Sequence, residues 1–241
     1  MKIVIPMAGL GSRFLSEGYQ IPKPFIDISG KMMIEHVLEG LHIPHTTYIL
    51  IIRQSFYKDY APFLQHLQSA FPVTFVSVEN VTQGAACTAL AAHEYINNDE
   101  PVLFADSDNL FTPTCIESFI TDAALRKLDG SLLTFKTTRP CYSYAAVNTQ
   151  GYVTATKEKS PISTHAICGA YYFKHGADFV KYAIEMLIYG DKIKNEYYMS
   201  NVYNYAIKHQ QKIGIYEISA TDWNCVGTPE QLTAYLRRTP C

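Results

Sequence analysis

The sequence KIVIPMAGLGSRF (residues 2–14) places a glycine-rich segment directly after a short apolar run. The run is rich in β-branched residues and predicts a buried strand. Gly9 and Gly11 predict a turn in which backbone N–H groups can converge on an anion, because no Cβ stands in the way. Taken alone, the segment is as compatible with an ordinary turn as with a phosphate-binding loop.

The glycine spacing excludes two common nucleotide-binding motifs. A dinucleotide fingerprint would need a third glycine at position 14, where this chain has Phe14. A P-loop would need Gly-Lys-Ser or Gly-Lys-Thr after four intervening residues, and this segment has neither. The pattern that remains is Gly-x-Gly-x-Arg, from Gly9 to Arg13.

Further apolar runs alternate with amphipathic stretches in the first half of the chain. The expected strands cover residues 47–53, 72–78, 101–106 and 130–136. The expected helices cover residues 32–41, 57–68, 85–96 and 113–127. This order is typical of an α/β fold, in which a mostly parallel sheet is covered by helices on both faces.

The second half of the chain is predicted to be richer in strands. Residues 142–158 predict a hairpin with Gly151 in its turn. After it we expect a strand at 166–173, helices near 175–189 and 199–209, a strand at 212–218 and a closing helix after Gly227. The whole pattern predicts one Rossmann-like α/β domain over residues 1–241.

Composition and charge exclude several functional classes. Lys and Arg number 20 and Asp and Glu 22, so the formal net charge of −2 gives no reason to expect nucleic acid or an anionic membrane as partner. No apolar stretch approaches the roughly 18–20 residues of a membrane span, and the N-terminus lacks the pattern of a secretory signal. The six cysteines form no Cys-x-x-Cys pair and are expected to be reduced thiols in a cytoplasmic protein.

A lysine follows the glycine-rich segment in a rigid context. Lys23 stands between Pro22 and Pro24, and each proline restricts its own backbone and that of the residue before it. Fixed near Arg13, this lysine could neutralise part of a triphosphate.

Two carboxylates, Asp106 and Asp108, follow the apolar run VLFA. Carboxylates at the end of a buried strand are costly unless a cation is present. Mg²⁺ prefers carboxylate oxygens together with substrate phosphates, so the pair predicts a site for a metal-bridged nucleotide. The alternative is that both residues cap the helix expected near Thr112.

The segments GLGSRF (residues 9–14) and PKPFIDISGKMMIEHVLEGL (residues 22–41) resemble the signature of the sugar-1-phosphate nucleotidylyltransferases, also called nucleotide-sugar pyrophosphorylases. The resemblance can be followed over nearly the whole chain. It implies the nucleotide-diphospho-sugar transferase fold, with a nucleotide-binding half over residues 1–135 and an acceptor-binding half with the closing helix over residues 136–241.

The resemblance also implies roles for particular residues. Lys23 and Arg13 would hold phosphates, Asp108 with Asp106 would hold Mg²⁺ or Mn²⁺, and Lys159 would contact the acceptor phosphate. The remaining implied contacts fall into two groups. The nucleotide contacts are Ala8, Gly9, Leu10, Gly11, Ser12, Gln83 and Gly84, and the acceptor contacts are Asn109, Glu158 and Gly169.

The chain departs from the family pattern in the segment DWNCVGTPEQL (residues 222–232). The family has a second metal-binding Asp two residues before Gly227, and here that position is Cys225. A thiol is a poor ligand for Mg²⁺. Asp222 or Asn224 could replace the missing carboxylate, or one protein carboxylate with phosphate oxygens could suffice. Thr228 and Pro229 predict the start of the closing helix.

The implied reaction transfers a nucleoside monophosphate from a nucleoside triphosphate to a sugar-1-phosphate. Pyrophosphate leaves, and the product is an activated sugar for surface-polysaccharide biosynthesis. A second reading keeps the chemistry but takes CTP and a non-sugar phosphate, such as phosphocholine, a phosphonate or a phosphorylated amino acid. A third is a non-catalytic nucleotide-binding regulatory subunit. The base, the acceptor and the oligomeric state stay open, with a homodimer as one option.

Overall fold

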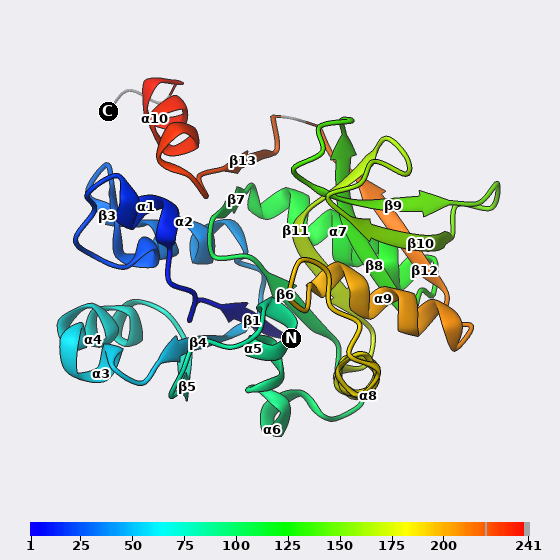
Figure 1. The fold of residues 1–241 in the computed structure, drawn as a ribbon, viewed down its shortest axis with the longest axis horizontal. Helices are drawn as coiled ribbons and strands as arrows, with labels where there is room; N and C mark the ends of the chain where they lie inside the picture. The colour runs from blue at the N-terminus through cyan, green and yellow to red at the C-terminus, as the bar shows by residue number, and fades with distance from the viewer. Residues whose placement is uncertain (220, 239–241) are drawn as a thin grey trace.

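A nine-stranded mixed sheet runs through both halves of the chain (Figure 1). The computed structural model describes residues 1–219 and 221–238. Along the main path the strands lie in the order β10-β9-β11-β6-β1-β4-β5, and β8 and β12 extend the sheet from β11. Because β11 of the second half pairs with β6 of the first, the sheet supports the proposal that residues 1–241 form one domain.

The strands of the sheet follow the predicted apolar runs. They are β1 (Lys2–Pro6), β4 (Thr47–Arg53), β5 (Val73–Val78), β6 (Val102–Ala105), β8 (Gly130–Lys136), β9 (Ser143–Val147), β10 (Val153–Glu158), β11 (His165–Phe173) and β12 (Ile213–Glu217). The β1, β4, β5 and β6 strands are parallel, as is the β8–β12 pair, whereas β11 is antiparallel to β6. The prediction of a mixed, mostly parallel core is confirmed.

The helices lie on both faces of this sheet, as predicted. They are α1 (Ser12–Ser16), α2 (Met33–Gly40), α3 (Phe56–Asp59), α4 (Ala61–Ala70), α5 (Ala85–Leu90), α6 (His93–Ile96), α7 (Pro113–Leu125), α8 (Gly176–Tyr189), α9 (Met199–Lys208) and α10 (Pro229–Arg238), with a 3₁₀ turn, η1, at Lys23–Phe25. None of the helices within residues 1–219 and 221–238 is both long and apolar enough to cross a membrane.

Two hydrophobic cores, one on each face, hold the sheet between the helices. Along β1 the side chains alternate, so that Ile3 and Ile5 enter one core and Val4 enters the other. The first core contains residues of α2, α4 and α7, and the second contains residues of α5, α6, α8 and α9. Burial on both faces explains why these strands read as continuous apolar runs.

Two predicted helices are each divided into two shorter ones, which corrects the sequence analysis. The segment 57–68 forms α3 and α4, because Pro62 in the first turn of α4 cannot continue a preceding helix. The segment 85–96 forms α5 and α6, separated by a turn at Ala91 and Ala92.

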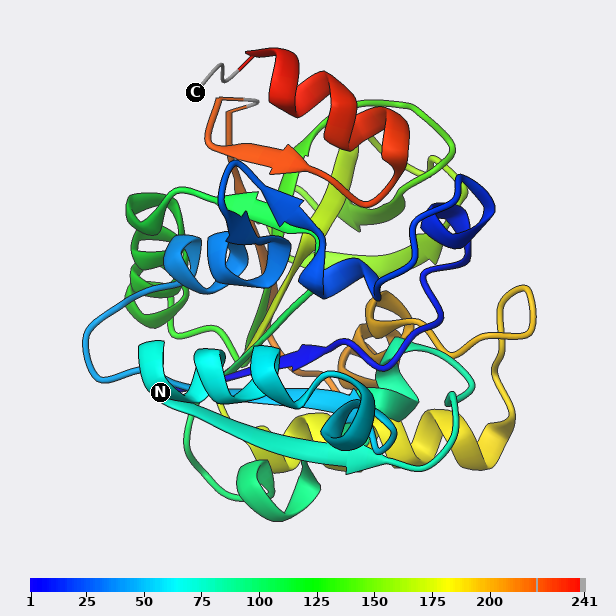
Figure 2. The same cartoon turned by 90° about the vertical axis from the view of Figure 1, so that its left-hand side faces the viewer.

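Four short strands lie outside the predicted set. The β2 (Asp27–Ile28) and β3 (Lys31–Met32) strands form a small hairpin, and β7 (Asn109–Phe111) pairs with β13 (Trp223–Cys225). Segments of two or three residues are too short for an alternating pattern to show in the sequence. In Figure 2, β13 and α10 lie above the segment that contains α1 and α2. The last strand and helix therefore return to the N-terminal part of the fold.

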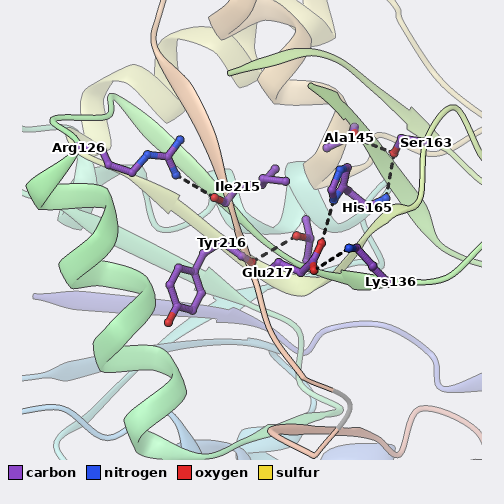
Figure 3. A network of polar contacts seen from close by, with 9 residues as sticks. Arg126, Lys136, Ala145, Ser163, His165, Ile215, Tyr216 and Glu217 are labelled. Carbon is purple, nitrogen blue, oxygen red and sulfur yellow. Dashed lines mark hydrogen bonds and ion pairs between the residues drawn. The ribbon is translucent and has the colours of Figure 1, made fainter. Parts of the chain in front are cut away.

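A polar network fixes β12, the edge strand of the second half (Figure 3). The Arg126 guanidinium donates to the carbonyl oxygens of Ile215 and Gly151 and to the Asp122 carboxylate, at 2.9, 3.2 and 3.0 Å. Further along β12, the Glu217 carboxylate lies 3.3 Å from Lys136 Nζ and 3.2 Å from His165 Nδ1. Arg126 thus satisfies a carbonyl that an edge strand would otherwise leave unpaired.

We predict that Arg126→Ala lowers the free energy of unfolding by about 1–3 kcal/mol, because two partly buried carbonyls lose their donor. Lys136→Ala is the matched control, since it removes an exposed ion pair of the same network and should cost about 0–1 kcal/mol. Urea denaturation measures both. Equal costs for the two variants would contradict the role given to Arg126.

Candidate functional site

The glycine-rich segment forms the turn between β1 and α1. Gly11 precedes α1 in the left-handed region, with φ 65° and ψ 33°, where a side chain is strained. A Cβ on Gly11 would also lie 3.3 Å from Cβ of Lys23. Two features therefore favour glycine at position 11, which are its left-handed backbone and its close packing against Lys23.

Two cavities meet at this turn. One, of about 340 Å³, is lined by Ala8–Ser12, by residues of the β5–α5 loop including Gly84, and by Glu196. The other, of about 260 Å³, is lined by residues 11–14, Lys23, Asp108 and Gly227. The loop and Lys23 thus face a common space, as the sequence predicts. Arg13 is exposed and lines the smaller cavity.

An ion pair forms part of the lining of the smaller cavity. The Lys23 Nζ donates to Asp108 Oδ2 at 2.7 Å, and each side chain is only 20% exposed. Partly buried charges of this kind need a partner, which each supplies to the other. The pair joins η1, near the N-terminus, to the segment after β6.

Asp106 lies beside this pair in a tighter environment. Burial, and secondly the charge of Asp108, raises the pKa of Asp106 to about 8, against the opposing effect of Lys23. Asn109 Nδ2 donates to Asp106 Oδ2 at 3.4 Å, and the Asp106 N–H donates to the Gly169 carbonyl at 2.9 Å. The two carboxylates therefore repel each other when both are ionised, and Lys23 offsets that repulsion only in part.

Gly169 makes the space for this arrangement. It lies within β11, where the pairing shifts between Ile167 and Tyr171, and its φ is 82°. A Cβ here would lie 2.4 Å from Asp106 Oδ2 and 2.2 Å from Asn109 Nδ2. The structure therefore shows a close-packing requirement at Gly169, and its predicted contact with an acceptor stays a prediction.

Trp223 is a site residue that the sequence analysis did not identify. Its Nε1 donates to Asn109 Oδ1 at 2.8 Å across the β7–β13 pair. Asn109 is thereby oriented by Trp223 on one side and Asp106 on the other. A single buried Trp needs a hydrogen-bond acceptor, which was the available signal, but the sequence did not say which acceptor.

Cys225 lies close to Asp108. A Cβ on Gly227 would lie 2.5 Å from Asp108 Oδ2 and 3.5 Å from Cys225 Sγ, so these two atoms are at most about 6 Å apart. Burial, and secondly the charge of Asp108, raises the pKa of Cys225 to about 12. A neutral thiol is a poor ligand for a hard cation such as Mg²⁺.

The two suggested substitutes for the missing carboxylate are placed differently. The Asp222 carboxylate accepts the N–H of Ser219 at 3.2 Å within its own turn. Asn224 alternates with Trp223 and Cys225 along β13 and so points to the opposite side. Within residues 1–219 and 221–238, no group of three or more His, Cys, Asp or Glu side chains could hold a metal ion. A metal here would depend on Asp106, Asp108 and ligand oxygens, a donor set that fits Mg²⁺ or Mn²⁺.

Glu158 and Lys159 lie at the end of β10. Ser143 and Ser200 donate to Glu158 Oε2, and burial raises the pKa of Glu158. Lys159, with φ 51°, donates from Nζ to the Tyr198 hydroxyl at 3.1 Å and lies 4.0 Å from Glu158 Oε1. Burial alone would lower the pKa of Lys159, but Tyr198 and the nearby carboxylates raise it. The serines and Tyr198 carried no recognisable sequence signal.

The Gln83–Gly84 pair is built into a backbone contact. The Gln83 carbonyl accepts the Tyr197 N–H at 2.8 Å, and the Tyr197 carbonyl accepts the Ala86 N–H at 3.1 Å. A Cβ on Gly84, which has φ 123°, would lie 2.5 Å from the Tyr197 carbonyl oxygen. Gly84 lines the larger cavity, but its lack of a side chain is required by Tyr197. The Gln83 residue is exposed.

The closing helix begins as predicted. Thr228 Oγ1 accepts the Gln231 N–H at 3.2 Å, and Pro229 is the first residue of α10. The described cysteines, which are Cys87, Cys115, Cys141, Cys168 and Cys225, are all free thiols, and Cys241 lies outside the described residues.

Comparison with known proteins places this chain in a family. The family model described as Nucleotidyl transferase matches residues 2–239, and the chain belongs to that family. It is therefore a nucleotidyltransferase. The comparison with curated protein sequences gave no match.

Solved structures share the fold over the full length. A nucleoside-diphosphate-sugar pyrophosphorylase from Vibrio cholerae RC9 is 24% identical, with TM-score 0.86, over 98% of this chain and 99% of that one. An inositol-1-phosphate CTP transferase from T. maritima is 15% identical, with TM-score 0.76, over 100% of this chain and 98% of that one. The predicted nucleotide-diphospho-sugar transferase fold is confirmed.

We predict that Gly169→Ala lowers the free energy of unfolding by about 2–5 kcal/mol, because left-handed strain of about 1–2 kcal/mol adds to overpacking against Asp106 and Asn109. Gly190→Ala is the control. Gly190 has φ 66° with nothing within 4 Å of an added Cβ, so only the strain remains. Urea denaturation compares them, and equal losses would contradict the packing argument.

Proposed function

We propose that this protein transfers a nucleoside monophosphate from a nucleoside triphosphate to a sugar-1-phosphate and releases pyrophosphate. The observation that carries the proposal is the Lys23–Asp108 pair facing the same cavity as the Gly9–Arg13 turn. Phosphoryl chemistry needs positioning and charge neutralisation more than a covalent nucleophile, and this cavity supplies both. Membership of the nucleotidyl transferase family supports the reaction type.

The turn between β1 and α1 is proposed to hold the triphosphate. The N–H groups of Ala8 to Ser12 would donate hydrogen bonds to phosphate oxygens, and the exposed Arg13 would bind the leaving pyrophosphate. As the α-phosphate is attacked, the Lys23 ammonium group would stabilise its growing negative charge in addition to that of Asp108. The nucleoside would occupy the larger cavity, beside Gly84 and near Gln83.

A divalent cation, Mg²⁺ or Mn²⁺, is proposed to be held by Asp108 and Asp106 together with the nucleotide phosphates. When bound, it would neutralise phosphate charge and orient the triphosphate for in-line displacement. The site suits a cation, because Asp106 and Asp108 repel each other when both are ionised and Lys23 offsets this only in part. Cys225 leaves the metal one protein carboxylate fewer than the resemblance implies.

The acceptor is proposed to lie between β10, β11 and β7. Lys159 would contact its phosphate, and Glu158 would accept hydroxyl groups, with Asn109 and Gly169 on the opposite side. The buried position of Glu158 suits a group that binds neutral hydroxyls, because few waters compete there. We extend this proposal to a cytoplasmic enzyme that supplies an activated sugar for surface-polysaccharide biosynthesis.

A non-sugar phosphate remains the second candidate acceptor. The structural likeness to an inositol-1-phosphate CTP transferase keeps this class open. A choline-like cation would need a cage of accessible aromatic rings, but three tyrosines of the acceptor-binding half, Tyr144, Tyr171 and Tyr172, are buried. A panel of four ribonucleoside triphosphates crossed with sugar-1-phosphates and non-sugar phosphates, followed by pyrophosphate release, tests both candidates. No release with any pair would refute the proposed reaction.

We predict that Lys23→Ala lowers kcat about 10²- to 10³-fold, because the α-phosphate loses a preorganised positive charge. Lys31→Ala is the matched control. Lys31 also pairs with a carboxylate, that of Glu39 at 2.6 Å. This pair is exposed, and Lys31 lines neither of the two cavities at the glycine-rich turn. Steady-state pyrophosphate release measures both, and unchanged turnover in Lys23→Ala would sink its assignment.

We also predict that excess EDTA abolishes pyrophosphate release and that added Mg²⁺ or Mn²⁺ restores it. Without the cation, two carboxylates would face the triphosphate and repel it. EDTA loaded beforehand with Mg²⁺ controls for effects of the chelator itself. Full activity in metal-free buffer would contradict the proposed cation.

A further inference from the structure

We propose that Glu196 binds the ribose hydroxyl groups of the nucleoside triphosphate, so that the enzyme selects ribonucleotides over deoxyribonucleotides. This inference rests on the proposed function and specifies its substrate class. Three observations support it. Glu196 lines the larger cavity beside the glycine-rich turn, a rigid turn of the backbone positions Glu196, and in a nucleotide the ribose links the base to the phosphates.

Glu196 is the only charged residue among those that line the larger cavity within the described parts of the chain. The nearby hydroxyls of Thr82 and Thr88 lie 2.5 Å apart, so that one donates to the other, and the second can donate to the Gly84 carbonyl. They are therefore occupied. The Glu196 carboxylate accepts no hydrogen bond within residues 1–219 and 221–238, so it offers its acceptor capacity to a ligand.

The backbone holds Glu196 in place at this cavity wall. Ile193 and Glu196 exchange two backbone hydrogen bonds, each of 3.0 Å, around a tight turn. Lys194 and Asn195, at the centre of that turn, both have positive φ, 50° and 66°. Two adjacent non-glycine residues in this region are costly and mark a conformation that the surroundings enforce.

The next residue anchors the turn to the nucleotide-binding half. Tyr197 forms backbone hydrogen bonds with Gln83 and Ala86, at 2.8 and 3.1 Å, and its carbonyl packs on Gly84. Backbone hydrogen bonds therefore hold the chain on both sides of Glu196. A side chain on so rigid a support loses little freedom when it binds, which favours specificity.

The covalent order of a nucleotide identifies the part that reaches Glu196. The phosphates lie at the Gly9–Arg13 turn, and the acceptor phosphate lies at Lys159. The charge of Glu196 contributes, after Tyr198 and Glu158, to raising the pKa of Lys159. Ribose is the part that joins the base to the α-phosphate, so it falls between the cavity wall and Lys159, where Glu196 lies.

The chemistry of a carboxylate agrees with this position. An ionised carboxylate accepts hydrogen bonds through two oxygens, which matches the two neighbouring hydroxyls of ribose. It repels phosphate oxygens, so the phosphates are excluded as its partner. An amino group on the base is the remaining donor, and it is a separate outcome of the test.

The test compares each ribonucleoside triphosphate with its 2′-deoxy form in the wild type, Glu196→Ala and Glu196→Gln. We expect the wild type to favour the ribonucleotide by about 10- to 100-fold in kcat/KM, as for the loss of a charge-assisted hydrogen bond. Glu196→Ala should bring that ratio close to one by slowing only the ribonucleotide, and Glu196→Gln should fall between. Lys194→Ala, in the same turn, and Glu94→Ala, on the surface of α6, are the controls and should keep the wild-type ratio.

Three results would overturn the proposal. One is a wild-type ratio near one. The second is an unchanged ratio in Glu196→Ala. The third is a variant that loses discrimination among bases but keeps it between ribose and deoxyribose, which would place Glu196 at the base.

Calorimetric titration separates this inference from the proposed reaction. Binding of the ribonucleotide and its deoxy form is measured with Mg²⁺ and without acceptor, so no turnover is required. A ribose preference that depends on Glu196 would stand even if no acceptor gave product. Equal binding of both sugars, or no binding of either, would refute it.

Discussion

The crowding of like charge at the end of β6 is the constraint on which the rest of the site depends. Asp106 and Asp108 stand two residues apart, and the ammonium group of Lys23 offsets their repulsion only in part. Every neighbouring element serves this arrangement. Gly169 and Gly227 leave room for the two carboxylates, Asn109 donates to one of them, and Trp223 orients Asn109. Two carboxylates that repel each other in this way suit the divalent cation that we propose for this site.

Much of the fold could be predicted from the sequence, because its physical basis is local. Burial on both faces makes β1, β4 and β6 continuous apolar runs, and these are easy to find. The divided helix at Pro62 was also within reach, since proline cannot continue a helix. The β7–β13 pair could not be predicted. It joins two segments more than a hundred residues apart, each three residues long, and neither has a pattern of its own.

The candidate site shows the same division. Arg13, Lys23, Asp106 and Asp108 follow apolar runs or prolines, and the structure brings Lys23 and the aspartates together as expected. The groups that hold them, such as Trp223, Ser143 and Tyr198, were missed because their role exists only after folding. The structure gives Gly84 and Gly169 a packing role that the sequence did not show, and their contacts with substrates stay predictions. Their missing side chains make room for the protein itself.

The backbone contact between Tyr197 and the β5–α5 loop has a consequence for how such a chain can change. A wall of the larger cavity, where we propose the nucleoside, comes from the second half, although the glycine-rich turn comes from the first. The two halves are therefore not interchangeable modules, because a fragment ending near residue 135 would lack that wall and the glycine that supports Asp106. Substitutions that adapt the second half to a new acceptor would also disturb the fit of the nucleotide. Selection on one substrate is thereby tied to selection on the other.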